Sequence, residues 1–196
     1  MTTTIEPMDA SRWDDLCTLF GPSGASSGCW CMYWRLPSKE WTAGNGSAAR
    51  DPVNGNKVKF ERVVARGEPT GLLAYVDGAP AGWVAVAPRD AFPRVFRSTT
   101  VAPLDPDEAG VWSVNCFFVA RRYRRSGLAS DLLTAAVTWA KENGAASVEG
   151  YPVLPAMVRG NAGDYYTGTV GQFEKAGFVL QPRENTLRRV VMRRTV

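Results

Sequence analysis

Apolar and polar positions along the chain repeat with two periods, one near two residues and one near 3.6 residues, which are typical of strands and helices. Taken from the N-terminus, they predict the order β-α-α-β-β-β-α-β-α-β-β. The predicted strands cover residues 4–8, 111–119 and 147–153, and two hairpins lie within residues 70–88 and 178–194. The predicted helices cover residues 9–21, 57–67, 127–144 and 169–177. This order predicts a mixed α/β domain.

The clearest strand–helix–strand unit runs from Val111 to Val153. Its first strand, "VWSVNCFFV", is apolar enough to be buried, and Gly144 ends the helix that follows. One face of this helix is formed by Leu128, Leu132, Ala136 and Trp139. Such a unit joins parallel strands by a right-handed crossover. We therefore expect one domain over residues 1–196, with a parallel pair in its sheet.

The composition is that of an ordinary globular chain, with 45% apolar and 21% charged residues among 196. No apolar run approaches the roughly 18 residues that span a membrane. The first residues, "MTTTIEPMDASRWDD", contain neither a basic segment nor an apolar core, so we expect a cytoplasmic protein with no membrane partner. The net charge of +4 suits an anionic partner or an ordinary solvated surface.

The chain has no histidine, which excludes nucleophilic sites with a histidine base and metal sites with histidine ligands. Four cysteines in a chain of this length do not indicate a disulfide framework. Cys29 and Cys31 could form half of a metal site, but no second thiol pair completes it, and we expect no metal. Any chemistry must therefore use carboxylates, tyrosines, thiols, backbone amides or water.

The segment "VARRYRRSGLAS", residues 119–130, joins a basic run to the bare backbone at the start of the long predicted helix. A helix N-terminus has unpaired N–H groups and about half a positive charge, and small residues let an anion approach them. Ser126, Gly127, Ala129 and Ser130 are therefore candidates for a phosphate cradle, with Arg124 and Arg125 at its rim. The alternative is an ordinary turn with solvated arginines. The nucleotide-binding patterns GK[ST] and GxGxxG are absent.

The hexapeptide "RRSGLA", Arg124 to Ala129, matches the "[QR]xxGx[GA]" signature of the GNAT superfamily of N-acetyltransferases, and "FEKAGF", Phe173 to Phe178, resembles that family's "YEKxGF". The resemblance implies a central mixed, mostly antiparallel sheet with a splayed parallel strand pair, flanked by helices. It implies acetyl-coenzyme A as co-substrate. The implied coenzyme site comprises Phe117, Phe118 and Val119 for the pantetheine arm, Arg124, Arg125, Ser126, Gly127, Leu128, Ala129 and Ser130 for the pyrophosphate, and Phe173.

The sequence departs from this family in its acid–base residues. Phe173 stands where a tyrosine often protonates the leaving thiolate, and Ser113 stands where a glutamate often acts as the base. Glu149, in an otherwise apolar strand, is the best remaining candidate base, although it could equally be a surface carboxylate. Tyr151, Tyr165 and Tyr166 are candidate acids, and solvent is an alternative. A backbone N–H of "CFFV" could stabilise the carbonyl oxygen.

The segment "GCWCMYWRLP" lies where the resembled fold places its acceptor floor. Its candidate acceptor residues are Trp30, Tyr33, Trp34 and Arg35, because large aromatic rings form rigid walls and an arginine can bind a carboxylate. The alternative is that these rings only anchor a long loop to the core.

These observations favour an N-acetyltransferase that acts on a small-molecule amine by direct attack in a ternary complex. A protein or peptide N-acetyltransferase and a non-catalytic acyl-CoA sensor are the alternatives. A nucleic-acid binder is disfavoured, because only Tyr123 offers a stacking ring beside the basic run. The final predicted hairpin could pair between two subunits as a homodimer.

Overall fold

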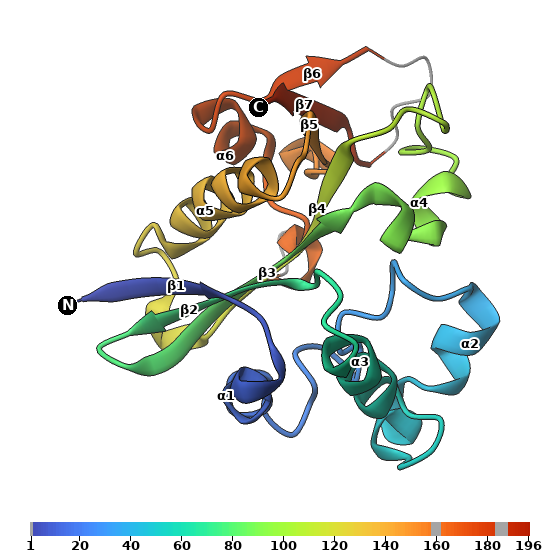
Figure 1. The fold of residues 1–196 in the computed structure, drawn as a ribbon, viewed down its shortest axis with the longest axis vertical. Coiled ribbons are helices and arrows are strands. Elements are labelled where there is room, and N and C mark those ends of the chain that lie inside the picture. The colour runs from blue at the N-terminus through green and yellow to red at the C-terminus, as the bar shows by residue number, and fades with distance from the viewer. Residues whose placement is uncertain (1, 158–161, 183–187) are drawn as a thin grey trace.

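The computed structural model describes residues 2–157, 162–182 and 188–196. One seven-stranded sheet passes through the molecule in the order β1-β2-β3-β4-β5-β7-β6 (Figure 1). Its strands are β1 (Thr3–Pro7), β2 (Gly71–Val76), β3 (Ala79–Pro88), β4 (Val111–Val119), β5 (Ser147–Gly150), β6 (Val179–Gln181) and β7 (Val191–Thr195). Neighbouring strands pair antiparallel except for the parallel pair β4–β5. The predicted fold class is therefore confirmed.

Helices cover both faces of this sheet. The α-helices are α1 (Trp13–Phe20), α2 (Ser38–Ala43), α3 (Asn56–Ala65), α4 (Pro93–Phe96), α5 (Leu128–Glu142) and α6 (Val170–Lys175). Helix α5 lies on β2, β3 and β4, and α1 contacts β3 from the opposite side (Figure 1). In the part of the chain that the structure describes, no helix is both long and apolar enough to cross a membrane.

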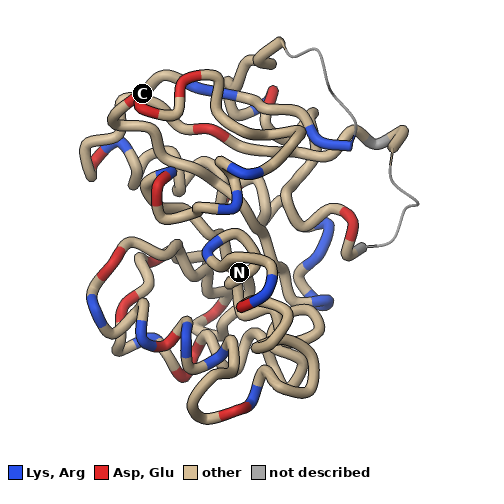
Figure 2. Tube along the Cα trace, turned by 90° about the vertical axis from the view of Figure 1, so that its right-hand side faces the viewer, with Lys and Arg blue, Asp and Glu red and all other residues tan. Residues whose placement is uncertain are grey.

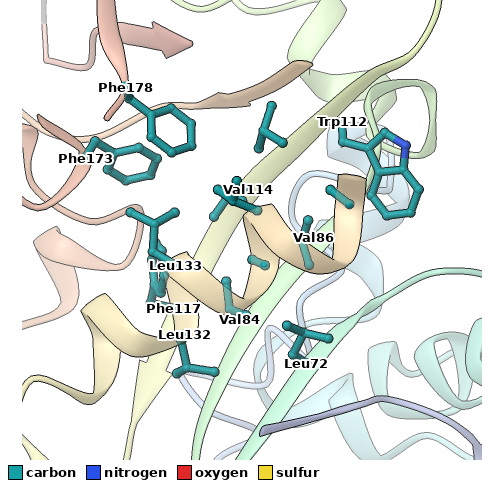
Figure 3. Close-up of a cluster of buried hydrophobic side chains, with 14 of the residues drawn as sticks. Leu72, Val84, Val86, Trp112, Val114, Phe117, Leu132, Leu133, Phe173 and Phe178 are labelled. Carbon is teal, nitrogen blue, oxygen red and sulfur yellow. The ribbon is translucent and has the colours of Figure 1, made fainter. Parts of the chain in front are cut away.

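The core beneath α5 follows from the 3.6-residue period of that helix. Leu132 and Leu133 are fully buried, and Figure 3 shows them among Val84, Val86 and Val114 of the sheet. Buried apolar side chains of this kind stabilise a fold by about 1.5–3 kcal/mol each. Trp139, predicted on the buried face, is only partly buried and packs edge-on against Trp112 at the margin of the core; the ring centroids are 5.4 Å apart.

The final hairpin does not extend the sheet in chain order. Strand β7 pairs antiparallel with both β5 and β6, so β6 is the edge strand. Val179 and Leu180 of β6 are exposed. The homodimer that the sequence suggests through this hairpin stays a prediction.

Candidate functional site

The sheet opens between its two parallel strands. β4 and β5 pair only as far as Val114 and Gly150, whereas β4 continues alongside β3 to Val119. The predicted strand 147–153 is therefore shorter in the structure, because it loses its β4 partner after Gly150. This divergence is the splay that the sequence resemblance implied.

A β-bulge in β4 lies at the opening. Val86 of β3 pairs with Val114 and Ala85 pairs with Cys116, so Asn115 is an extra residue in β4. The bulge changes which positions face α5. Val114 lies in the core beneath α5, but after the bulge Phe117 lies there and Cys116 packs on the opposite side. Asn115 thus lies just after the last residue of β4 that pairs with β5, and it is also the point at which the side chains of β4 change faces of the sheet.

The N-terminus of α5 presents unpaired backbone amides. Gly127, the N-cap residue, has a φ of +91°, and Arg125 has a φ of +66°. The N–H groups of residues 125–129 donate to no acceptor among the described residues. A Cβ on Gly127 would meet nothing within 4 Å. Successive free N–H groups with left-handed residues among them form a concave anion site.

The basic residues beside this N-terminus are exposed but not all free to move. Nε of Arg124 donates to the carbonyl of Val119 (3.0 Å), and the guanidinium of Arg122 lies over the ring of Tyr123. Ser126 Oγ donates to the carbonyl of Tyr123 (2.7 Å). In the view of Figure 2, blue basic and red acidic segments are interspersed along the trace. The positive charge is therefore concentrated in the short run of arginines that precedes α5. The face of the molecule seen in Figure 2 is not uniformly basic.

Backbone amides on the two sides of the opening donate to carbonyls of the segment 166–168. The N–H of Phe117 donates to the carbonyl of Tyr166 (2.6 Å), and the N–H of Val153 donates to the carbonyl of Gly168 (3.0 Å). Val153 also forms an isolated parallel bridge with Thr169. The segment 166–169 therefore lies between the end of β4 and Val153. A ligand that binds the N–H of Phe117 must displace the carbonyl of Tyr166.

Phe173 closes the α5 side of the opening. Its ring is fully buried and contacts the ring of Phe117, with 6.2 Å between centroids, and the ring of Phe178. A Cβ on Gly150 or Gly168 would collide with it. The ring thus packs against backbone on both sides of the opening, and this side chain has no proton to donate.

Glu149 lies at the closed end of the opening, in register with Ser113 of β4. Only 4% of the residue is exposed. Oε1 lies 3.4 Å from Nη1 of Arg89 and 3.8 Å from Nη1 of Arg193, and the hydroxyl of Tyr151 donates to Oε2 (3.3 Å). Arg89 therefore balances the charge of the candidate base, and Arg193 contacts both Glu149 and Glu108.

The same two arginines anchor the segment that precedes β4. Nη2 of Arg89 donates to the carbonyls of Asp105 (2.8 Å) and Glu108 (3.3 Å). Arg193 pairs with the carboxylate of Glu108 and donates to Oγ of Ser147 (2.8 Å). Glu149 thus belongs to a buried network with a clear structural role, whatever its role in proton transfer.

The three candidate acids lie in different surroundings. The hydroxyl of Tyr151 is 2.9 Å from Oγ of Ser113, and burial together with the charge of Glu149 raises the pKa of Tyr151 well above its usual value. Burial likewise raises the pKa of Tyr166, and Tyr165 ends the short 3₁₀ helix Ala162–Tyr165. Phenols of this kind donate hydrogen bonds at neutral pH but release protons poorly.

The two tryptophans of the predicted acceptor segment lie in different cores. The ring of Trp30 packs against Trp13 (5.9 Å between centroids) and Phe20 (5.5 Å) on the α1 side of the sheet. Trp34 packs beside Tyr151, with ring centroids 6.1 Å apart. Trp34 therefore contacts the candidate catalytic group, whereas Trp30 holds the loop on α1.

Tyr33 packs edge-on against Trp34, with ring centroids 5.0 Å apart, and Arg35 is the next residue along this segment. The guanidinium of Arg94 lies 4.2 Å from the centroid of the Tyr33 ring. The guanidinium of Arg35 lies over the ring of Phe92 (4.7 Å) and donates to the carbonyl of Pro69 (3.1 Å). Burial lowers the pKa of Arg35 to about 10, so it remains a cation at neutral pH. It retains the charge needed to bind an acceptor carboxylate.

The loop that carries these rings has an unusual backbone. Ala25, Ser27, Trp30 and Cys31 are non-glycine residues with φ values between +45° and +68°. Such conformations cost roughly 1–3 kcal/mol each and persist where packing holds them. Here the indole N–H of Trp83 donates to Sγ of Cys31 (3.1 Å), and Cys31 is buried.

The Cys-x-Cys pair has no metal-site geometry within the described residues, where no group of three or more His, Cys, Asp or Glu side chains could hold an ion. Burial raises the pKa of the Cys29 thiol to about 11. The thiol is therefore protonated at neutral pH, and it is not an activated nucleophile.

Three residues of the site were missed by sequence reasoning. Arg89 and Arg193 have no local pattern that connects them to Glu149. Asn115 offered a signal, because apart from Ser113 it is the only polar residue in the apolar strand Val111–Val119. It is fully buried, and neither Nδ2 nor Oδ1 has a hydrogen-bond partner among the described residues.

Replacement of Trp34 by alanine should lower the melting temperature by roughly 10 °C. Trp34 is 6% exposed, and truncation of a buried tryptophan costs about 3–5 kcal/mol, at roughly 2–4 °C per kcal/mol in a chain of this size. Thermal melts of Trp34→Ala and of the milder Trp34→Phe measure this. An unchanged melting temperature, with only a higher acceptor KM, would instead show that the ring binds the acceptor and contributes little to the stability of the fold.

Comparison with known proteins identifies this arrangement. The family model described as "Acetyltransferase (GNAT) family" matches residues 30–152, from the aromatic loop through the strand that carries Glu149. No curated protein matches the sequence.

Solved structures of low sequence identity share the fold. The PaiA N-acetyltransferase from Thermoplasma acidophilum, in complex with coenzyme A, is 13% identical over 100% of both chains, with a TM-score of 0.55. YncA from Salmonella typhimurium, a putative acetyltransferase with its cofactor acetyl-CoA, is 12% identical over 100% of this chain and 94% of its own, also at 0.55. The diaminobutyrate acetyltransferase EctA from Paenibacillus lautus, in complex with L-2,4-diaminobutyric acid and coenzyme A, is 13% identical over 97% and 93%, at 0.51.

Proposed function

Because the chain belongs to the GNAT acetyltransferase family, we propose that it transfers the acetyl group of acetyl-coenzyme A to a primary amine of a small molecule. The amine attacks directly while both substrates are bound. In this proposal residues 1–196 act as a single domain, because β1 and β7, near the two ends of the chain, belong to one sheet.

The observation that carries the proposal is the set of free amides at the start of α5. The coenzyme pyrophosphate is an anion that binds such amides, and the residues present suit it: Gly127 leaves the approach open, and Ser130 lies in the first turn. Arg124 and Arg125 add positive charge at the rim. Leu128 and Ala129 supply two further N–H groups and turn their side chains toward the core.

The pantetheine arm would run from this cradle along the free side of β4. The backbone of Val119, Phe118 and Phe117 leads from α5 to the opening, and Phe173 forms an apolar wall there. The N–H of Phe117 becomes available to the arm only when the carbonyl of Tyr166 moves away.

Bound acetyl-coenzyme A supplies a thioester carbonyl carbon that an amine can attack. The N–C bond forms, the C–S bond breaks with its electron pair remaining on sulfur, and the nitrogen loses one proton. We assign this proton to the hydrogen-bonded group of Ser113, Tyr151 and Glu149, with Glu149 as the base. The hydroxyl of Tyr166 would donate a hydrogen bond toward the leaving sulfur, that of Tyr151 could do so only by giving up its bond to Oε2 of Glu149, and water supplies the proton.

The acceptor would enter from the side opposite α5. Trp34 beside Tyr151, together with Tyr33 and Arg35, favours an aromatic or partly apolar amine that carries a carboxylate. Trp30 contributes indirectly by holding this loop on α1.

A non-catalytic acyl-CoA sensor is the second candidate, and two observations favour it. Phe173 replaces the proton-donating tyrosine, and Glu149 is already ion-paired with Arg89. A sensor would bind acetyl-coenzyme A without consuming it.

Release of free thiol from acetyl-coenzyme A tests the proposal. We expect thiol release that depends on a small primary amine, in a panel of amino acids and aromatic amines, with a lysine peptide and an amine-free sample as controls. Release with the peptide alone would identify a peptide acetyltransferase. Thermal stabilisation by acetyl-coenzyme A without thiol release would identify the sensor.

A further inference from the structure

Asn115 is a fully buried amide at the point where β4 leaves β5. Its Nδ2 and Oδ1 atoms have no hydrogen-bond partner in the described part of the chain. Buried polar groups are almost always paired, and an unpaired one destabilises the fold. The fold alone therefore gives no reason for an amide at this position, whereas a ligand that pairs with it would.

The bulge places Asn115 between two groups that face away from α5. Two residues earlier, Ser113 bonds the hydroxyl of Tyr151 in the candidate catalytic group. One residue later, Cys116 packs in the cluster beneath the aromatic loop. Val114 and Phe117 lie on the α5 side. Asn115 is thus flanked along β4 by Ser113 and Cys116, which face the proposed acceptor side, at the point where the pairing with β5 has ended.

The direction of the proposed coenzyme leads to the same residue. The pyrophosphate cradle lies after β4 in the chain, so the arm runs backward along the strand, past Val119 and then Phe117. Its reactive end therefore reaches Asn115, where β5 rejoins the sheet. This step rests on the proposed function.

We propose that Asn115 is a catalytic residue whose Nδ2 donates a hydrogen bond to the carbonyl oxygen of the thioester. Negative charge gathers on this oxygen as the amine attacks, and a fixed donor in a dry site stabilises it. The backbone N–H of Phe117 is engaged by Tyr166, whereas Nδ2 of Asn115 needs no protein partner to release it. The binding of the substrate thereby supplies the partner that the fold lacks.

Two variants and a matched control separate a role in catalysis from a role in folding. Asn115→Leu removes the amide at similar size, and Asn115→Ala serves if leucine does not fit. Neither breaks a hydrogen bond, so the melting temperature of the free protein should stay the same or rise for Asn115→Leu and should fall for Asn115→Ala only by the cost of the small cavity that alanine leaves. Asn56→Leu is the control, because Asn56 is equally buried but its Nδ2 donates to the carbonyl of Gly28 (3.3 Å); its melting temperature should fall.

The infrared band of carbonyl-labelled acetyl-coenzyme A then reports the contact without an acceptor. In the wild type, the C=O band of the bound thioester should lie below its position in free solution. In both Asn115 variants it should return toward the free position, while affinity for coenzyme A changes less than about twofold. With an active amine, turnover should fall about 10²–10³-fold, as expected for a lost oxyanion donor.

The outcomes distinguish this proposal from the one on which it rests. If the wild type does not bind acetyl-coenzyme A, both are wrong. If it binds and the variants show the wild-type band position, only the role of Asn115 is wrong. A melting temperature of Asn115→Leu and Asn115→Ala that falls as far as that of Asn56→Leu would also overturn it, since it would reveal a structural role.

Discussion

Replacement of Gly127 by alanine should abolish the thermal stabilisation that acetyl-coenzyme A gives the protein. At about a hundredfold excess over Kd, a ligand stabilises by roughly 2.7 kcal/mol, which corresponds to about 5–10 °C here. The added Cβ points into the open space where the proposed phosphates bind, and Gly127 has a left-handed φ of +91° that an L-residue tends to leave. Both effects disturb the free N–H groups, and thermal melts with and without acetyl-coenzyme A measure the loss.

Gly144 provides the matched control for this variant. It follows α5, has a φ of +85°, and a Cβ there would also meet nothing within 4 Å. Gly127→Ala and Gly144→Ala should therefore lose similar intrinsic stability, roughly 1–2 kcal/mol. Only the former should lose the response to acetyl-coenzyme A. Equal responses in both variants would contradict the placement of the pyrophosphate at the start of α5.

Replacement of Glu149 by glutamine should lower turnover by about 10²–10⁴-fold, the usual effect of losing a general base. It should also destabilise the protein, because Arg89 is buried and would lose its carboxylate partner. Breaking a buried ion pair from one side costs about 3–5 kcal/mol. Steady-state kinetics at a temperature well below the melting transition separates the two effects.

The double variant Arg89→Met with Glu149→Leu distinguishes an anchor from a base. Apolar replacement of both partners of a buried ion pair is often close to neutral for stability. Arg89→Met also removes the hydrogen bonds from Nη2 to the carbonyls of Asp105 and Glu108, so stability should recover only in part relative to Glu149→Gln. If Glu149 serves only as the ion-pair partner of Arg89, turnover should recover together with stability. If Glu149 is the base, turnover should stay low.

Several features of this protein are determined locally and were predictable from the sequence. The strand Val111–Val119 has its predicted bounds, and α5 (Leu128–Glu142) lies within the predicted helix 127–144. Periodicity encodes which side of an element is buried. It therefore also predicts the unit in which α5 connects the parallel strands β4 and β5. The free amides at Gly127 follow from a helix N-terminus with small residues, which is a property of a few consecutive positions.

Tertiary packing decided the surroundings of the candidate catalytic groups. Glu149 resembled a free carboxylate in an apolar strand, but Arg89, 60 positions earlier, and Arg193 pair with it. The amide of Phe117 resembled a free donor at the opening, but the carbonyl of Tyr166 occupies it. No local period encodes these contacts, because their partners are distant in the chain.

The bulge at Asn115 shows most clearly the difference between what the sequence determines and what only tertiary packing decides. The apolar pattern of β4 is compatible with a regular strand, and the sequence by itself determines only that a strand lies there. The pairing of β4 with β3 inserts the extra residue, and the departure of β5 after Gly150 leaves its buried amide at an opening in the sheet. Register and strand divergence are properties of three strands packed together, and for this reason only the tertiary structure could reveal Asn115 as a candidate catalytic residue.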